Sequence, residues 1–582
     1  MTRALKLLSA LPIGISLSIG VAAPAFATQG GAADQVISQA SLSGSYLAGR
    51  FAGKQRDNAI AALYFQRALE VDPGNPVLIE RAFVLDLGAG NMQRAELLAE
   101  QVAKFNPQHR MARIVLGLKA FREKNYKVAR DHFSKAAFTP VGELTSGLLN
   151  AWVYAAEGKF PEAMRALDVL DKQEAFVNFK LFHAALIADL LRSETGASGR
   201  YRTAYEKAGA SLRVVQAYGN FLERQGNKDE ARKVYGQFLA VSQRNPLVRE
   251  QLDQLNGGQQ PRAFISSASE GASEALFSLA SALSDEQSID IALVYAQLAL
   301  MLKPDFAVAR TLLGEIYEDI QRHDLAIEVY EKVKETSVLR ASAEIQIATN
   351  LDALGKSDEA IEELRKLVER EPGNYDAQLS LGNVLRSHEK WAEAADAYSN
   401  AIAALGSSFG KKQWSLLYFR GISYERAGAW DKAEADFRKA LEFEPEQPQV
   451  LNYLGYSLID KGKSLSEALE MVKKAVELRP NDGYIVDSLG WAYYKLGDYE
   501  ESVKQLERAV ELRPEDPVIN DHFGDALWRV GRRLEAKFQW QHAKDNKPEP
   551  KDLANIERKI NEGLGDLPKA PPAASGDNQR KL

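Results

Sequence analysis

Residues 483–514, GYIVDSLGWAYYKLGDYEESVKQLERAVELRP, carry the pattern from which the architecture of the whole chain follows. Apolar residues recur in two runs at helical spacing, and a proline closes the second run. Proline ends a helix there because it lacks an N–H and clashes with the preceding turn. Pro480, Pro514 and Pro548 recur at intervals of 34 residues. The stretch therefore predicts a pair of helices that is repeated along the chain.

Small and large residues alternate at fixed positions of this unit. Gly490 and Ser502 fall at positions 8 and 20, where small side chains let the two helices approach closely. Tyr493 and Leu506 fall at positions 11 and 24, where we expect large side chains to fill the seam between units. This is the 34-residue tetratricopeptide pattern, and each unit buries its apolar face only against its neighbours.

The same phase can be followed through most of the chain, and it predicts an all-α, right-handed superhelical solenoid of about 14 helical hairpins. Spacing alone does not distinguish an open superhelix from a closed one. Predicted units begin near Leu42, Pro76, Arg110, Leu144, Asn178 and Leu212, and then near Ser273, Ala307, Ala341, Tyr375, Trp414, Pro448, Gly483 and Pro517. The predicted segments are a degenerate block at 42–255, an interrupting loop or hinge at 256–272, a second block at 273–550, a capping helix at 551–565 and a disordered tail at 566–582.

The first 27 residues read as a secretory signal peptide. Arg3 and Lys6 precede an apolar stretch, and Ala25-Phe26-Ala27 matches the small-x-small cleavage pattern. The stretch is short for a spanning helix, which favours cleavage before Thr28 over an uncleaved anchor. We expect a soluble periplasmic chain that has no transmembrane segment after cleavage, with residues 28–41 as a linker.

Composition excludes several classes of function. The chain has 582 residues, of which 45% are hydrophobic and 26% charged, and its formal net charge is −6. No basic excess is present to neutralise a phosphate backbone, so we expect no nucleic acid partner. Cysteine is absent, which excludes disulfides, thiolate ligands, a cysteine nucleophile and the acylated cysteine of a lipoprotein.

The sequence carries no complete catalytic or metal-binding motif. Gly355-Lys356-Ser357 and Gly462-Lys463-Ser464 match only the end of a P-loop and fall in predicted turns. The seven histidines are scattered and never recur at i, i+4. We predict no catalytic residue, no metal and no cofactor, and hence not an enzyme.

The last four units place an unusual set of side chains on the helix-A positions that line the concave groove of such arrays. Aromatic rings beside amide and acidic groups suit the capture of a peptide or a partner helix, since rigid rings contribute contact area at low entropic cost. The alternative is that several of these rings simply pack one helix against the next. The candidate protein-binding residues are Tyr418, Asn452, Tyr456, Asp487, Trp491, Tyr494, Asp521, Asp525, Trp528 and Arg529, with His522 among them.

Three runs give a more specific resemblance: LNYLGYSL at 451–458, DSLGW at 487–491 and GDALWRVGR at 524–532. They are similar to the C-terminal units of the LbcA family of Gram-negative envelope adaptors. Members of that family look like non-enzymatic scaffolds that bind and activate a carboxyl-terminal processing protease and present peptidoglycan hydrolases to it. The present chain departs from the family pattern because it lacks the lipoprotein cysteine.

Two other functions stay open at this point. Long envelope tetratricopeptide proteins also serve polysaccharide export and outer-membrane assembly, so a scaffold of that kind is the first alternative. The second is an envelope enzyme with an unrecognised active site in the first block. The sequence also leaves open whether the solenoid self-associates.

Overall fold

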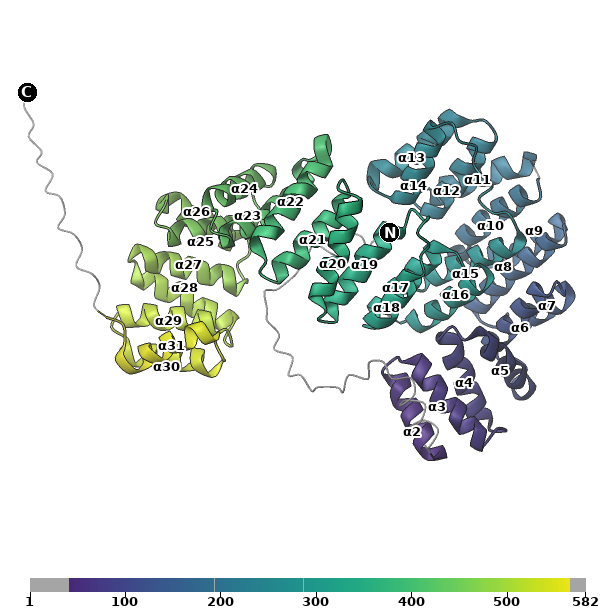
Figure 1. Cartoon of the computed structure of the whole chain (residues 1–582), viewed down its shortest axis with the longest axis horizontal. Coiled ribbons are helices and arrows are strands. Elements are labelled where there is room, and N and C mark those ends of the chain that lie inside the picture. Colours follow the sequence, from purple (N-terminus) through teal and green to yellow (C-terminus); the bar gives the residue numbers. More distant parts are fainter. Residues whose placement is uncertain (1–40, 193, 286, 566–582) are drawn as a thin grey trace, which may run out of the picture. The chain divides into compact units, whose positions relative to one another are not determined.

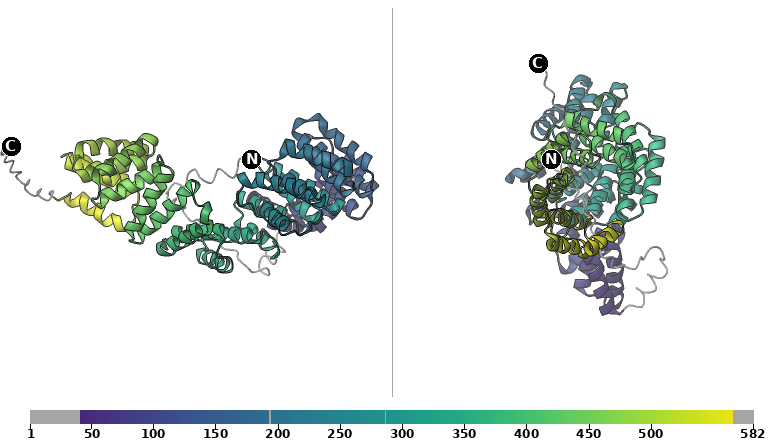
Figure 2. Two further views of the ribbon diagram at one scale, coloured as in Figure 1. Left: turned by 90° about the horizontal axis from the view of Figure 1, so that it is seen from above. Right: turned by 90° about the vertical axis from the view of Figure 1, so that its left-hand side faces the viewer.

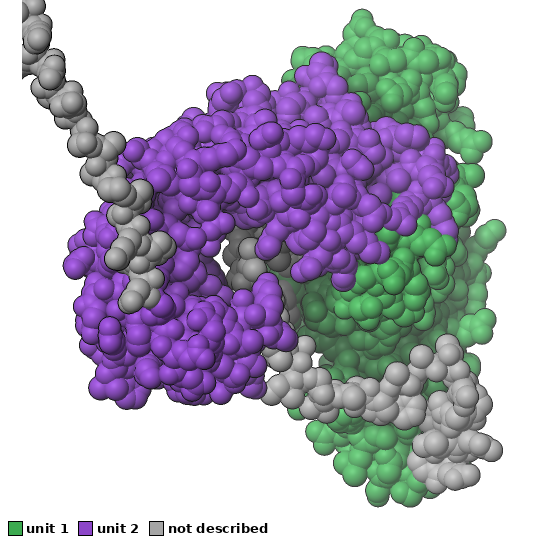
Figure 3. Space-filling view, turned by 60° about the vertical axis from the view of Figure 1, so that its left-hand side comes forward, with its two compact units in different colours: residues 1–364 green, residues 365–582 purple. Residues whose placement is uncertain are grey.

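The computed structural model describes residues 41–565 except 193 and 286. The predicted signal peptide, residues 28–40 of the predicted linker and the predicted tail lie outside the described residues. The described chain forms α-helices and short 3-10 segments, without a strand. It divides into two compact units, residues 1–364 (unit 1) and 365–582 (unit 2), which are coloured separately in Figure 3.

Unit 1 stacks its helical hairpins in chain order (Figures 1 and 2). We call the first helix of a hairpin its A helix and the second its B helix. The A/B pairs are α2(Leu42–Lys54)/α3(Asn58–Val71), α4(Pro76–Gly88)/α5(Met92–Phe105), α6(Arg110–Arg122)/α7(Tyr126–Ser134), α8(Pro140–Ala156)/α9(Phe160–Asp168), α10(Val177–Leu190)/α11(Glu194–Ala208) and α12(Leu212–Arg224)/α13(Lys228–Val241), followed by the single helix α14(Pro246–Asn256), then α15(Ala268–Ala282)/α16(Ile289–Leu302), α17(Ala307–Asp319)/α18(His323–Glu331) and α19(Arg340–Ala353)/α20(Ser357–Arg370), with 3-10 segments η2(Val169–Lys172) and η3(Glu174–Phe176).

Unit 2 begins within α20, and its own hairpins are stacked in chain order. Its pairs are α21(Tyr375–Ser387)/α22(Trp391–Leu405), α23(Trp414–Arg426)/α24(Trp430–Phe443), α25(Pro448–Asp460)/α26(Leu465–Leu478), α27(Gly483–Leu496)/α28(Tyr499–Leu512) and α29(Pro517–Arg529)/α30(Arg533–Asp545), with 3-10 segments η4(Gly406–Ser408) and η5(Lys411–Gln413) and a last helix α31(Pro550–Glu562). The described chain thus holds the 14 hairpins that the sequence predicts.

The hairpin α27/α28 shows why the quoted stretch folds as it does. Asp482 caps α27 by accepting hydrogen bonds from the first-turn N–H groups, and Asp498 caps α28 in the same way. Gly497 ends α27 at φ 84°, a left-handed conformation that glycine adopts without steric cost. A two-residue turn between two capped helices leaves them antiparallel and in contact.

The glycine at position 8 is needed because the side chain at position 24 of the same hairpin lies against it. A methyl group added at Gly490 would come within 2.5 Å of Leu506. The large residue at position 24 also fills the seam between units as expected, since Leu506 lies in one buried cluster with Phe523 and Leu527 of the next hairpin. The same close approach pairs Gly117 with Phe133, Gly219 with Tyr235, Gly314 with Tyr330, Gly382 with Tyr398, Gly421 with Phe437 and Gly524 with Trp540.

Two helices begin earlier than the predicted units. α8 starts at Pro140 because Thr139 caps it and proline is favoured at the first helical position. α15 starts at Ala268 because the Ser267 side chain accepts a hydrogen bond from the Glu270 N–H. The predicted loop at 256–272 is therefore shorter at its C-terminal side. α14 has no B helix, which the repeat spacing did not predict.

Unit 1 closes on itself. α15 packs against the A helices α8 and α10, and α16 packs against α4, although these helices are far apart in the sequence. Gly271 of α15 lies directly on the ring of Trp152 of α8, so that an added methyl group would come within 2.2 Å of it. Thr145 Oγ1 and Tyr295 OH share a hydrogen bond of 2.8 Å. The A-helix face of the first block is thus an interior surface of unit 1.

A buried ion pair joins the first block to α15. Arg213 of α12 donates from Nε to Glu274 of α15 at 2.8 Å, and Glu274 is 1% exposed. The Arg213 guanidinium also lies over the rings of Phe264 and Phe306, 4.4 and 5.4 Å from their centroids. A charge pair this buried is tolerated because both ions are hydrogen-bonded.

Residues 257–267, between α14 and α15, are held against α12. The Asn220 side chain donates to the Arg262 carbonyl at 2.8 Å and accepts from the Phe264 N–H at 3.1 Å. Ile265 is 6% exposed. These contacts pack the segment against α12. The loop lies within unit 1, so the two compact units do not coincide with the two predicted sequence blocks.

Candidate protein-binding face

The A helices of unit 2 carry the predicted groove residues, and those on α23 and α25 are partly exposed. Tyr418 packs into an aromatic cluster with Phe437 and Tyr453, at centroid distances of 6.1 and 6.0 Å. Asn452 and Tyr456 lie one turn apart on α25 and so share one face of that helix. Burial raises the pKa of Tyr456 to about 12, with a contribution from the nearby Asp487 carboxylate. Tyr456 is thus a neutral phenol near a carboxylate.

Trp491 is the centre of a stack. The Tyr494 ring lies parallel to it at 4.6 Å, and the His522 ring lies at 4.0 Å. His522 Nδ1 is 3.0 Å from the Asp487 carboxylate. With Tyr494 and His522 stacked against it, Trp491 fastens α27 to α29 and is not a free platform for a ligand.

His522 is held by charge as well as by stacking. Burial alone lowers the pKa of His522, but the Asp487 carboxylate, with Asp521 and Asp525 nearby, outweighs this effect. The pKa of His522 therefore lies above its usual value. A protonated histidine here neutralises part of the acidic charge that the sequence places on this face.

Lys559 of α31 neutralises the other acids. Its Nζ lies 2.8 Å from Asp521 and 2.8 Å from Asp525, and Lys559 itself is 4% exposed. Burial alone lowers the pKa of Lys559, but the two carboxylates raise it above its usual value. Asp525 also accepts a hydrogen bond from Trp540 Nε1 at 2.9 Å. These two aspartates are therefore engaged within the chain.

The segment after α31 covers the end of the same face. Trp528 Nε1 donates to the Leu564 carbonyl at 3.1 Å, and Arg529 donates to the Gly565 carbonyl at 2.8 Å. Gly563 packs on the Trp528 ring, where an added methyl group would come within 2.1 Å. α31 thus occupies the segment predicted as a capping helix, and it covers Trp528 and Arg529.

The ten predicted residues therefore form two groups. Tyr418, Asn452 and Tyr456 lie on α23 and α25 and are partly exposed, as are Trp491, Tyr494, Asp521, Trp528 and Arg529. The remaining residues, Asp487, Trp491, Tyr494, Asp521, Asp525, Trp528 and Arg529, form an internally satisfied cluster that joins α27, α29 and α31. Sequence reasoning missed Lys559, although the amphipathic pattern of α31 was the signal that this helix packs on the last hairpin.

The described residues hold no group of three or more His, Asp or Glu side chains arranged as metal ligands. Across the same part of the chain, no helix combines the length and the apolarity needed to cross a membrane.

Family comparisons agree with this architecture. The tetratricopeptide repeat family matches residues 403–545, 81–142, 345–408 and 307–337. The chain is a tetratricopeptide repeat protein, an all-α solenoid of a class that acts as a scaffold for protein–protein interaction.

Curated relatives share part of this array. The TPR repeat-containing protein PA4667 of Pseudomonas aeruginosa is 29% identical over 187 residues, which are 32% of this chain and 30% of the relative. The human protein O-mannosyl-transferase TMTC1 is 24% identical over 177 residues, 30% of this chain and 20% of the relative. The chain therefore spans less than a third of the length of each of these relatives.

Two solved structures match most of this chain at low identity and low TM-score. A chain of the APC/C hetero-tetramer Cut9–Hcn1 is 15% identical with a TM-score of 0.36, and the match covers 92% of this chain and 98% of that one. Yeast Tom70 is also 15% identical, with a TM-score of 0.32 and coverage of 89% and 95%.

Proposed function

We propose that this chain is an exported, non-enzymatic adaptor of the periplasm that binds and activates a carboxyl-terminal processing protease and presents cell-wall hydrolases to it. The scaffold class of the fold supports the protein-binding part. The similarity of the runs at 451–458, 487–491 and 524–532 to the envelope adaptor family supports the choice of partner. Such an adaptor raises the effective concentration of a substrate at its enzyme without doing chemistry.

One observation carries the location of the binding face. Asn452 Oδ1 is buried without a hydrogen-bond partner among the described residues, and Tyr456 lies one turn further along α25 with a hydroxyl that makes no hydrogen bond to them. Both residues are partly exposed, so the Tyr456 hydroxyl and the accessible part of the Asn452 side chain can form hydrogen bonds with an approaching partner backbone. We therefore place partner binding at α23 and α25.

The test is a capture experiment with the chain from Thr28 onward as bait and a periplasmic extract as source, read by mass spectrometry. The proposal expects a processing protease and a peptidoglycan hydrolase to be recovered. The double variant Asn452→Ala, Tyr456→Ala should recover the protease at least about tenfold less well, because aromatic anchors dominate interfaces.

Phe538→Ala is the matched control, since Phe538 is 60% exposed on α30, away from this face of α25. It should capture the protease as well as the parent does. Recovery of export or outer-membrane assembly components in place of the protease would replace the protease adaptor with the envelope scaffold alternative. Substitution of Trp491 or Trp528 is unsuitable here, since both rings hold unit 2 together.

A further inference from the structure

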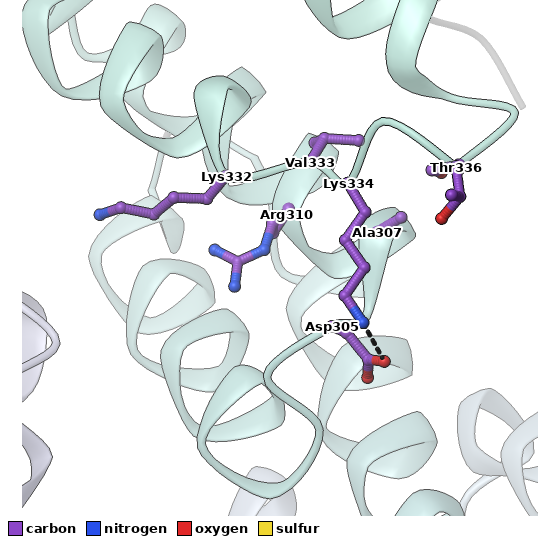
Figure 4. Close-up of a pocket in the computed structure, with 8 residues that line it drawn as sticks. Asp305, Ala307, Arg310, Lys332, Val333, Lys334 and Thr336 are labelled. Atoms are coloured by element: carbon purple, nitrogen blue, oxygen red, sulfur yellow. Dashed lines mark hydrogen bonds and ion pairs between the residues drawn. The ribbon is translucent and has the colours of Figure 1, made fainter.

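A small cationic hollow lies beside the start of α17 and the turn after α18. Arg310, Lys332, Val333, Lys334 and Asp305 line it, and its volume is about 80 Å³ (Figure 4). A water molecule takes roughly 30 Å³ in the liquid, so the hollow holds two or three waters or one carboxylate group. The side chains of Arg310 and Lys332 extend to the same side of the close-up, whereas Lys334 turns toward Asp305.

One cation of the hollow is already paired with a carboxylate of this chain. Lys334 Nζ donates to the Asp305 carboxylate at 3.0 Å. That hydrogen bond lowers the pKa of Asp305. One lysine of the cluster is thus matched by the one carboxylate of the lining, which leaves two cations.

Of the two remaining cations, Arg310 is also attracted by the Asp305 carboxylate, and neither forms a direct ion pair in the described part of the chain. Arg310 donates to the Pro304 carbonyl, and burial lowers the pKa of its guanidinium. Lys332 makes no ion pair there and is exposed. A partly desolvated guanidinium that shares one carboxylate with a lysine is incompletely neutralised, and an incoming oxyanion stabilises it. The planar fork of arginine matches a carboxylate with two parallel hydrogen bonds.

We propose that this hollow is a docking site for an acidic segment of a protein partner, with a side-chain carboxylate of the partner held between Arg310 and Lys332. The chain as a whole carries a net charge of −6, whereas the lining of the hollow holds three cations and one carboxylate, so its local positive charge favours acidic segments. The inference rests on the proposed scaffold function for the class of partner, but not on the identity of the protease.

The site can be tested with the full chain and short labelled peptides, by fluorescence anisotropy at low and at physiological salt. The first peptide carries four glutamates in a Gly/Ser background with an amidated C-terminus. The second has glutamines in their place, and the third is the glutamine peptide with a free C-terminal carboxylate. We expect the first to bind and the other two to bind at least about tenfold more weakly, since a charge-assisted pair is lost.

Variants assign the binding to the hollow. Arg310→Gln and Lys332→Gln should each weaken binding of the glutamate peptide about fivefold to tenfold. Arg310→Lys, which keeps the charge but not the fork, should lie between the parent and Arg310→Gln. Lys127→Gln, an exposed lysine of α7, should bind as the parent does.

Several results would overturn the site. If the glutamate and glutamine peptides bind equally well, the site does not recognise a carboxylate. If the third peptide binds as well as the first, the site does not require a side-chain carboxylate. A loss in Lys127→Gln as large as in Arg310→Gln shows non-specific attraction. Circular dichroism of each variant must match the parent. Failure to capture a protease contradicts the proposed function but leaves this peptide result unchanged, so the two failures can be distinguished.

Discussion

The A helices of the two units have the same place in the repeat but different surroundings. In unit 1, α8 buries 11 of its 17 residues, because α15 packs on the face that an open array leaves to a ligand. In unit 2, α23 buries four of 13 residues. One repeat pattern thus serves in one place as an interior and in another as a surface. Partner binding should accordingly be sought on α23 and on the partly exposed residues of α25, a helix that buries eight of its 13 residues.

The largest expected effect comes from breaking the closure of unit 1. Glu274→Ala leaves the Arg213 guanidinium buried against aromatic rings without its carboxylate, which should cost about 3–5 kcal/mol of unfolding free energy. Urea denaturation measures the decrease in unfolding free energy. Hydrogen exchange read by mass spectrometry shows which helices are destabilised. Exchange should rise in α8, α12 and α15 and stay unchanged in α23 to α27.

Glu270→Ala is the control for that experiment. The Glu270 pair with Lys303 is longer, at 3.7 Å, and partly exposed. Its loss should cost about 1 kcal/mol or less. If Glu274→Ala costs no more than Glu270→Ala, the buried pair does not hold unit 1 closed.

A smaller effect is expected from Gly271→Ala. The added methyl group meets the Trp152 ring at 2.2 Å, and both partners are buried. Overpacking of this kind should destabilise unit 1 by about 1–3 kcal/mol. Gly199→Ala, inside α11 with open space around it, should be neutral or stabilise by about 0.5–1 kcal/mol. Thermal unfolding of both variants checks the pair, and equal midpoints would refute the close approach of α15 to α8.

The smallest effect is a pH dependence of opposite sign in the two units. Burial lowers the pKa of His183 in unit 1 to about 4, from 6.5, so the unfolded chain binds the extra proton first. Unit 1 should lose stability as the pH falls from 6.5 to about 4. The pKa of His522 in unit 2 is raised, so its contribution is present below pH 6.5 and is lost as the pH rises through the raised value.

Urea midpoints of His183→Asn and His522→Asn, each compared with the parent across this range, separate the two contributions. The difference between His183→Asn and the parent should shrink in acid, and that between His522→Asn and the parent should shrink in base. Parallel profiles for the two variants would mean that the charged surroundings of the two histidines do not differ as described.

Much of the fold follows from the sequence because the repeat is local. Proline, the capping residues and the glycine at position 8 act within one hairpin, so the starts at Pro448, Gly483 and Pro517 were predicted to the residue. The closure of unit 1 was not predicted, because it depends on contacts between helices far apart in the chain. The sequence nevertheless contains an indication of this closure. α8 and α10 are apolar on nearly every side, which is typical of a helix buried all round.

The candidate site was predicted less well. Position in the repeat correctly put Asn452 and Tyr456 on one face of α25, because that is a property of one helix. It could not show that Lys559 neutralises Asp521 and Asp525, or that Tyr494 and His522 stack on Trp491. Those contacts bring together three helices, and each removes a residue from the surface that helical periodicity alone would leave open.

The most direct test of the contrast between the units uses the absence of cysteine from the chain. Thr145 of α8 and Ser415 of α23 both lie at position 2 of their repeats, but Thr145 is fully buried and Ser415 is partly exposed. In Thr145→Cys the thiol should react with a maleimide only as fast as unit 1 opens. In Ser415→Cys it should react at a rate close to that in urea. Equal rates in the folded protein would contradict a filled A-helix face in unit 1 and an accessible one in unit 2.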